Sequence, residues 1–278
     1  EDEPRNARVL GVSECSDLAV IDIEGDGFPT LSWAEEDPST GLEIYVAGFP
    51  LGAEEYTLLD GIVSKESADG ETSWASVGRV IEHSADTLPG TSGGPLVTGS
   101  GAVVGVNYAG DESGQSFAIA AGEAREVVEE LRAGVDVTSV GVNGTAFVGE
   151  DLSGVWVSSV ESGSPAAEVG IRAGDVVTRL ENLVMGTDGT MADYCDVLRS
   201  HLPTDPLAVE VFRPETGETL EGTLNGSPLE VSFSFEQTIE GSAGPTSYEG
   251  YTTVSDDTGS ISVDVPTAWA EVNGSAWA

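Results

Sequence analysis

Short apolar runs separated by Gly, Pro and Asp constrain the fold of this chain more than any other feature of its sequence. The runs span residues 15–23, 43–50, 56–64, 73–83, 94–98, 102–108 and 115–119. The chain also contains 36 Gly and 13 Pro, which supply the turns between the runs. Short strands with regular turn signals are typical of an antiparallel barrel or sandwich, so we expect a mostly β fold.

A second unit of mixed α and β character is expected after a helix over residues 121–132, which has Gly134 just past its end. Residues 134–150 are interpreted as a Gly/Val-rich connection. Strands are then predicted at residues 155–160, 175–180, 207–213 and 218–224, with helices at residues 164–170 and 191–200. We predict domains at residues 1–134 and 135–226, followed at residues 227–278 by a polar linker and the start of a truncated β unit, with a strand at 261–266.

The charge of the chain excludes one class of partner. It has 49 acidic and 10 basic residues, a formal net charge of −39. Phosphate backbones and anionic membrane surfaces repel such a chain, so nucleic acid is excluded. No run of 18 apolar residues appears, and we therefore expect no membrane span. Strong acidity is common in proteins that stay soluble outside the cell or in high salt.

Cys15 and Cys195 are far apart in sequence and fall in different predicted domains. We therefore expect two small buried hydrophobic side chains and no disulfide. The first residue is Glu1, not Met, and no signal peptide opens the chain. The chain is thus expected to be a processed or truncated piece whose export signal lies upstream.

The stretch from Thr87 to Val97 places the hydroxyl of Ser92 in a run of Gly and Pro that leads into an apolar strand. An acyl-transfer serine needs backbone amides directed at the developing oxyanion, and small neighbours leave room for the substrate carbonyl. The amides of Gly90 and Ser92 are the candidates for this oxyanion hole. Taken alone, the stretch is also compatible with an ordinary Gly-rich hairpin turn.

Residues 22–27 imitate the opening of a calcium-binding loop. Trp33 stands at the twelfth position of that loop, where a bidentate Glu is required. We interpret the segment as a solvated acidic turn and predict no metal site.

With these residues in view, the chain resembles the HtrA family of secreted trypsin-like serine proteases, followed by a PDZ domain. The resemblance covers roughly residues 9–225, and its motifs stand in the order typical of the family. They are Asp17-Leu18-Ala19-Val20-Ile21, Gly48-Phe49-Pro50-Leu51-Gly52, Gly61-Ile62-Val63-Ser64, residues 81–97, Val104-Gly105-Val106-Asn107, Phe117-Ala118-Ile119, Gly163-Ser164-Pro165-Ala166 and Ala173-Gly174-Asp175.

The resemblance implies two β-barrels, the first incomplete here, with the active site between them. It implies that Ser92 attacks the scissile carbonyl, that Asp17 fixes the tautomer of a histidine, and that the amides of Gly90 and Ser92 bind the oxyanion. No cofactor is implied, because a His-Asp pair activates the serine. Thr91 stands where the family usually has Asn, and we expect only its backbone to matter.

The histidine of such a triad is missing from the expected place. In the family it precedes the aspartate by a few tens of residues, and no His occurs before Asp17. His83 lies in the segment leading to Ser92, and His201 lies at the end of a predicted helix, so we expect structural roles for both. Because the serine then lacks its general base, the chain as given should be nearly inert.

The resemblance further implies that the second domain binds the carboxyl terminus of a peptide. The peptide would be added as a strand beside residues 155–160, with the helix at 191–200 as the opposite wall. Backbone amides around Leu152, Ser153 and Gly154 are the candidates for its carboxylate, with ordinary strand entry as the alternative. The other residues expected at this groove are Val155, Val157, Tyr194 and Leu198.

Two functions remain open at this point. The first is an extracytoplasmic serine endopeptidase, periplasmic or secreted, that cleaves unfolded or damaged polypeptides and engages chain termini through its PDZ domain. The second is a catalytically dead barrel retained as a scaffold for PDZ peptide binding. A structural surface protein with a fortuitous Gly-Thr-Ser-Gly-Gly would require every other match to be accidental. Family members often trimerise through amino-terminal segments, so the resemblance also implies a homo-oligomer of the full-length protein.

Overall fold

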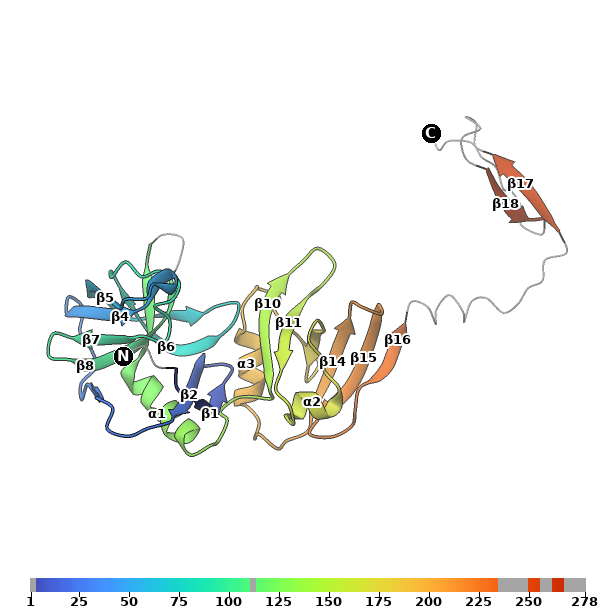
Figure 1. The fold of residues 1–278 in the computed structure, drawn as a ribbon. Helices are drawn as coiled ribbons and strands as arrows, with labels where there is room; N and C mark the ends of the chain where they lie inside the picture. Colours follow the sequence, from blue (N-terminus) through green and yellow to red (C-terminus); the bar gives the residue numbers. More distant parts are fainter. Residues whose placement is uncertain (1–3, 111–113, 235–249, 256–261, 268–278) are drawn as a thin grey trace. The chain divides into compact units, whose positions relative to one another are not determined.

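The structure, a computed structural model, describes residues 4–110, 114–234, 250–255 and 262–267 (Figure 1). The chain forms two compact units, Glu1–Ser232 and Phe233–Ala278. In the second unit β17 (Tyr251–Ser255) and β18 (Ser262–Pro266) pair antiparallel. The predicted strand at residues 261–266 is thereby confirmed over its described part, whereas the division into domains at residues 134 and 226 stays a prediction.

The first unit opens with a hairpin of β1 (Ala7–Ser13) and β2 (Leu18–Ile23). The strand β1 lies before the first predicted strand, at residues 15–23, and was not predicted. Its first three residues, Ala7, Arg8 and Val9, are exposed, but its second half turns alternate residues inward. Gly11 there lies against the helix α1 (Ala121–Arg132), where a Cβ would come within 3.0 Å of the Leu131 backbone.

A closed antiparallel barrel follows the hairpin. Its strands are β4 (Glu43–Gly48), β5 (Thr57–Glu71), β6 (Ser76–His83), β7 (Pro95–Thr98), β8 (Ala102–Gly110) and β9 (Ser116–Ala120). The order is β8-β7-β4-β5-β6-β9, and pairing of β9 with β8 closes the ring. A short β3 (Ser32–Trp33) joins β8 in parallel, and the 3-10 turn η1 (Pro50–Gly52) follows β4. The predicted strands of this region are confirmed with bounds shifted by a few residues, except that β5 continues to Glu71, well beyond its predicted end at residue 64.

The remaining part of the first unit is a second sheet with two helices. Its strands are β10 (Val142–Val148), β11 (Ser153–Val160), β12 (Val176–Leu180), β14 (Leu207–Arg213), β15 (Glu218–Leu224) and β16 (Glu230–Ser234), hydrogen-bonded in this order, with β13 (Leu183–Val184) beside β12. The helices are α2 (Pro165–Val169) and α3 (Ala192–Arg199). Three strands, β10, β13 and β16, were not predicted. Gly144 interrupts the apolar pattern of β10, yet a Cβ there would meet a Val155 methyl at 2.5 Å, so the strand requires a glycine.

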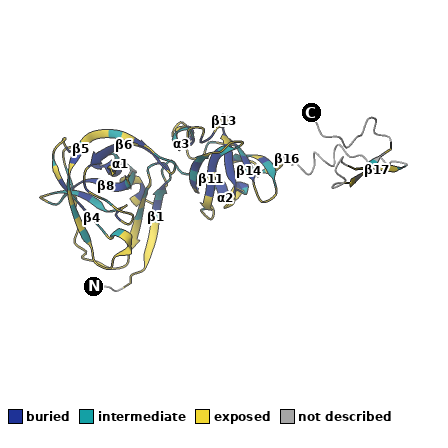
Figure 2. Ribbon diagram, turned by 90° about the horizontal axis from the view of Figure 1, so that it is seen from above, coloured by how far each residue is buried: buried dark blue, intermediate teal, exposed yellow. Residues whose placement is uncertain are grey.

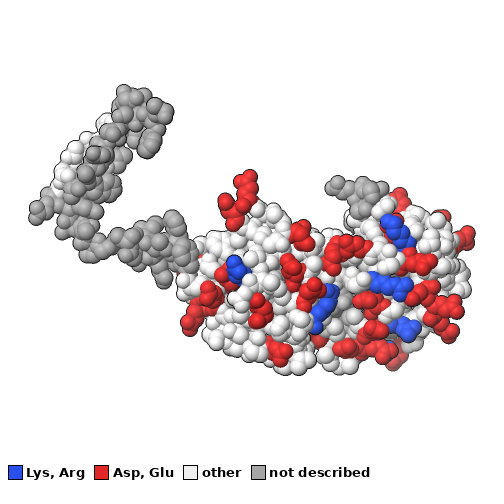
Figure 3. Space-filling view, turned by 180° about the vertical axis from the view of Figure 1, so that it is seen from behind, with Lys and Arg blue, Asp and Glu red and all other residues white. Residues whose placement is uncertain are grey.

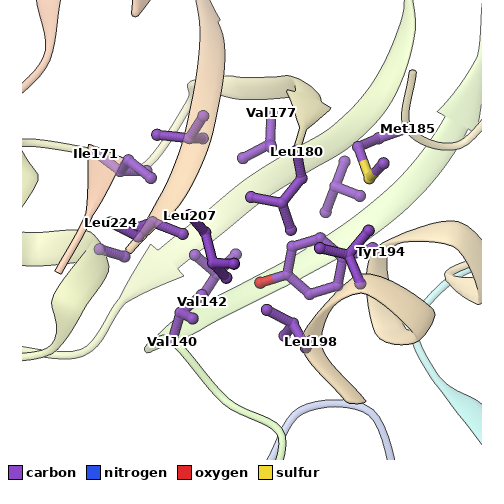
Figure 4. Packing of buried hydrophobic residues seen from close by; sticks show 14 of the residues in the cluster. Val140, Val142, Ile171, Val177, Leu180, Met185, Tyr194, Leu198, Leu207 and Leu224 are labelled. Atoms are coloured by element: carbon purple, nitrogen blue, oxygen red, sulfur yellow. The ribbon is translucent and has the colours of Figure 1, made fainter. Parts of the chain in front are cut away.

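The buried residues, dark blue on the ribbon of Figure 2, form separate hydrophobic cores in these parts. Ile44, Val63 and Ile81 are among the side chains that fill the barrel. The second sheet has a larger core, in which Tyr194 and Leu198 of α3 pack against sheet residues such as Leu180 and Leu207 (Figure 4). Cys15, which follows β1, belongs to this second core.

Cys15 and Cys195 form a disulfide, which corrects the expectation of two free buried thiols. Their sulfur atoms are 2.13 Å apart and their Cα atoms 5.6 Å apart, a separation typical of a disulfide. Both residues are fully buried. The expectation failed because separation along the chain says nothing about separation in space: the turn between β1 and β2 lies against α3.

Acidic side chains outnumber basic ones over the face shown in Figure 3. Some of them are paired, as in the exposed contact of 3.2 Å between Arg8 and Asp22. Within the part of the chain that the structure describes, none of the helices has the length and apolar character that a bilayer crossing requires.

Candidate active site and peptide groove

Ser92 lies on an exposed turn between the barrel strands β6 and β7. Gly90 and Gly93 on either side have φ angles of +103° and +81°, which favour glycine. A Cβ on Gly90 would lie 2.5 Å from the Phe49 carbonyl oxygen, and one on Gly94 would lie 2.2 Å from that of Ala47. Glycine is therefore needed at these positions because the turn lies very close to the end of β4 and the segment that follows it.

Some backbone amides of this turn are paired and others are not. Those of Thr91, Gly93 and Gly94 donate to the carbonyls of Leu88, Asn107 and Thr91 at 3.0, 2.7 and 2.9 Å. The amides of Gly90 and Ser92 donate to no acceptor among the described residues. These are the two amides expected to bind an oxyanion, and the turn leaves both available beside the serine hydroxyl.

A series of hydrogen bonds between buried polar side chains supports the turn. His83 Nε2 lies 3.1 Å from Asn107 Oδ1, Asn107 Nδ2 donates to Thr91 Oγ1 at 3.1 Å, and Thr91 Oγ1 donates to the Leu88 carbonyl at 2.8 Å. His83, Thr91 and Asn107 are at most 2% exposed. We expected only the backbone of Thr91 to matter, and this was wrong, because its hydroxyl connects Asn107 to the loop that precedes Ser92.

Asp17 lies directly before β2, with a φ of +51°. Desolvation raises the pKa of its carboxyl, and a hydrogen bond from the Trp74 side chain opposes the rise. Both side chains line a cavity of about 630 Å³ that Ser92 does not line.

Both Asp17 and Ser92 interact with Tyr108. The Tyr108 carbonyl accepts a 3.4 Å hydrogen bond from Ser92 Oγ. Burial raises the pKa of the Tyr108 phenol, and the charge of Asp17 adds to this rise. No contact between Asp17 and Ser92 themselves is present among the described residues.

Neither histidine is positioned as a general base. The His83 ring pairs with Asn107, and its other nitrogen, Nδ1, is buried without a partner among the described residues. His201 Nδ1 lies 2.8 Å from the Val197 carbonyl at the end of α3. Both side chains thus have structural contacts, and in the described chain neither contacts Ser92 or Asp17.

The residues predicted for the peptide groove need a correction. A peptide strand was expected beside β11, but β11 pairs with β10 on one side and β12 on the other, so Val155 and Val157 offer no free edge. Leu152, Ser153 and Gly154 enter this interior strand, and Gly154 packs against the Val177 carbonyl. Among the described strands, the edges of this sheet are β10 and β16, and β10 is the edge strand beside β11.

Tyr194 and Leu198 come from α3, as predicted, but they point into the core of the second sheet (Figure 4). The sequence signal that we missed is Ser139-Val140-Gly141-Val142. Gly141 has a φ of +88°, and a Cβ there would come within 2.1 Å of the Ser164 side chain, so this glycine is required. A required glycine before an apolar residue marks the start of β10.

Two family profiles match the chain. The one described as a trypsin-like peptidase domain matches residues 1–106, and the one described as a PDZ domain matches residues 156–206. These assignments agree with the barrel and with the second sheet, respectively.

Curated relatives of the chain are serine proteases by name, in agreement with the first of these profiles. The chain is 30% identical over 251 residues to Serine protease Do-like HtrB of Bacillus subtilis, covering 80% of this chain and 54% of that protein. It is 30% identical over 240 residues to a probable periplasmic serine endoprotease DegP-like of Marinomonas sp., covering 80% and 50%. Among solved structures, "HtrA-type protease AlgW with decapeptide" has 26% identity, covers 81% of this chain and 71% of that one, and has a TM-score of 0.45. The chain thus spans about half the length of the curated relatives it matches.

Proposed function

Because the chain carries a trypsin-like peptidase domain followed by a PDZ domain, and its homologues are HtrA/Do serine proteases, we propose that the complete protein is a serine endopeptidase of this type. The observation that carries the proposal is the turn around Ser92. It exposes one hydroxyl and leaves the amides of Gly90 and Ser92 unpaired among the described residues.

The proposed chemistry is acyl transfer. Ser92 Oγ attacks the scissile carbonyl, and the amides of Gly90 and Ser92 stabilise the oxyanion that forms. Asp17 orients a histidine that takes the serine proton. Neither His83 nor His201 is placed for that role, so this chain by itself is proposed to have almost no proteolytic activity.

Substrates and location follow from the relatives as proposals. We expect unfolded or damaged polypeptides as substrates, and the PDZ part would bind their carboxyl termini along the free edge of β10. An extracytoplasmic location is supported by the name of the periplasmic relative and by the disulfide, which persists in oxidising compartments.

A fluorophosphonate probe tests the enzyme proposal. The protein is expressed from its complete coding sequence and treated with the probe beside Ser92→Ala and Ser100→Ala, a control that removes another exposed hydroxyl. Labelling of the wild type and of Ser100→Ala, but not of Ser92→Ala, is expected. A folded wild type that takes up no probe would contradict the proposal.

A folded wild type that takes up no probe would favour a different function. The absence of any contact between the two histidines and Ser92 in the described residues is what a catalytically dead scaffold would show. Peptide binding by the PDZ part would then be the remaining activity.

A further inference from the structure

Glu14 places its carboxylate in a pocket of hydrogen-bond donors at the start of β10. Oε1 accepts from the backbone amides of Val140, Gly141 and Val142 at 3.0, 2.6 and 2.7 Å, and from Ser139 Oγ at 2.6 Å. Oε2 accepts from the Tyr194 hydroxyl at 2.9 Å. All of these partners donate, which is the arrangement that suits an ionised carboxylate.

The pocket is made by the backbone of residues 139–142, and Gly141 and Ser164 constrain its shape. Gly141 adopts φ = +88°, and the side chain of Ser164 fills the space that a Cβ would need. Successive amides that converge on one point make an anion-binding concavity, and such concavities capture the carboxyl termini of peptides. The pocket is thus fitted to a carboxylate as a chemical class.

The strand edge beside the pocket is also occupied. Ser73, in the turn between β5 and β6, accepts a hydrogen bond of 2.6 Å from the Ala146 amide on the outer edge of β10. The neighbouring Thr72 carbonyl accepts from the Met191 amide at the start of α3, at 2.9 Å. An added peptide strand would need the same Ala146 donor.

A covalent bond fixes the arrangement. Cys15 follows Glu14 directly and is joined to Cys195 in α3. Glu14 therefore remains close to its donors even when the noncovalent contacts open for a moment. A tethered group acts at an effective concentration on the order of mM. A free peptide must therefore bind the pocket tightly enough to compete with a carboxylate at that concentration.

We propose that Glu14 is an internal occupant of the carboxylate pocket of the PDZ part, held there by the Cys15–Cys195 disulfide, and that it closes the β10 groove to peptide carboxyl termini. Both carboxylates need the same donors and carry the same charge, so they exclude each other. The peptide half of this statement rests on the proposed function of the PDZ part, whereas the position of Glu14 does not.

Hydrogen exchange tests the occupant directly. Exchange of the Val140, Gly141 and Val142 amides is measured by NMR in the wild type, Glu14→Ala and Glu150→Ala, which removes an exposed carboxylate from the loop after β10. Glu14→Ala should exchange these amides at least about tenfold faster, while Glu150→Ala should match the wild type. Unchanged protection in a folded Glu14→Ala would overturn the proposal.

Binding of a defined probe tests the closure. The probe is a pool of fluorescein-labelled heptapeptides of random sequence with free carboxyl ends, and the same pool with amidated ends is the control. Glu14→Ala and the double variant Cys15→Ala/Cys195→Ala should bind the free-carboxyl pool at least about tenfold more tightly than the wild type. All three proteins should have the same affinity for the amidated pool. Equal affinity for the wild type and both variants would overturn the closure.

The two readouts keep the proposals separate. Protection that depends on Glu14, with no peptide binding by any variant, would support Glu14 as occupant and contradict peptide binding as the function of the PDZ part. If Glu14→Ala fails to fold by circular dichroism, Glu14→Gln takes its place. It keeps the side-chain volume but replaces one acceptor oxygen with a donor, and it should also accelerate exchange of the three amides.

Discussion

The carboxylate of Glu14 accepts a hydrogen bond of 2.9 Å from the phenol of Tyr194, 180 residues later in the chain. Burial raises the pKa of both groups, and the hydrogen bonds to Glu14 oppose the rise at the carboxyl. The contact lies next to the Cys15–Cys195 bond. Together they join the β1–β2 hairpin to α3 through polar and covalent contacts where an apolar interface would be the simpler solution.

Removal of the Thr91 hydroxyl should destabilise the turn around Ser92. Thr91→Val keeps the side-chain shape but leaves the buried Asn107 amide without its acceptor. We expect a loss of about 1–3 kcal/mol in the free energy of unfolding, measured by urea denaturation. The control Thr30→Val, at an exposed position, should stay within about 0.5 kcal/mol of the wild type. Equal values for the two variants would show that the Thr91 hydroxyl contributes nothing.

The two glycines that flank Ser92 should respond differently to a methyl group. Both have positive φ, so Gly93→Ala should cost about 1–2 kcal/mol from backbone strain alone, since nothing lies within 4 Å of its added Cβ. Gly90→Ala adds a clash with the Phe49 carbonyl oxygen and should cost clearly more. Thermal and urea unfolding of both variants measure the difference, and a smaller loss for Gly90→Ala would refute this reading of the turn.

A buried ion pair in the second sheet should be sensitive to loss of one partner. Arg213 Nε and Nη2 donate to the two Asp175 carboxylate oxygens, both at 2.8 Å, and both side chains are at most 10% exposed. Asp175→Asn leaves the guanidinium without its counter-charge and should cost about 3–5 kcal/mol in urea unfolding. Asp22→Asn, which breaks the exposed pair with Arg8, should cost at most about 1 kcal/mol. Similar losses would mean that burial does not govern these pairs.

The stability of the barrel should depend on the protonation of His83. Desolvation lowers the pKa of His83 below its ordinary value of 6.5, and the hydrogen bond to Asn107 only partly opposes this. As the pH falls below about 6.5, the unfolded chain takes up a proton that the folded protein refuses, so the folded state loses stability by at most about 1.4 kcal/mol per pH unit.

The measurement compares variants, because many carboxylates titrate in the same experiment. Unfolding free energies of the wild type and His83→Gln are determined between about pH 7.5 and about pH 5.5. The wild type should lose stability relative to His83→Gln as the pH falls, whereas Thr30→Val, which changes an exposed side chain that does not titrate, should follow the wild type. A difference between wild type and His83→Gln that does not change with pH would contradict the prediction.

Local patterns predicted most of the fold. The hairpin strands β14 and β15 were predicted with their observed bounds, because alternating apolar residues flank a clear turn. The helix α1 was predicted with its bounds as well, since its buried residues recur at helical spacing. The turn around Ser92 was visible because Gly and Pro residues cluster on both sides of this serine, at residues 89–95.

The failures are of two kinds: strands whose own sequence pattern is weak, and contacts between distant residues. β1 and β10 were missed because polar residues or a glycine interrupt the apolar pattern of their sequences. Pairing with β2 and β11 stabilises these strands although their own pattern is weak. Missing β10 moved the predicted peptide edge to β11. The disulfide, the Glu14 contacts and the Thr91 network each join segments that no sequence window contains, although two cysteines in a chain expected outside the cytoplasm were a signal for the bond.

The disulfide sets an order of events during synthesis. Cys15 is made 180 residues before Cys195, so at about 5–20 residues per second its thiol waits roughly 10–40 s for a partner. During that time the barrel can form while the β1–β2 hairpin is still untethered. The bond between the hairpin and α3 can close only after Cys195 has been made, so the hairpin first folds without its covalent link to α3.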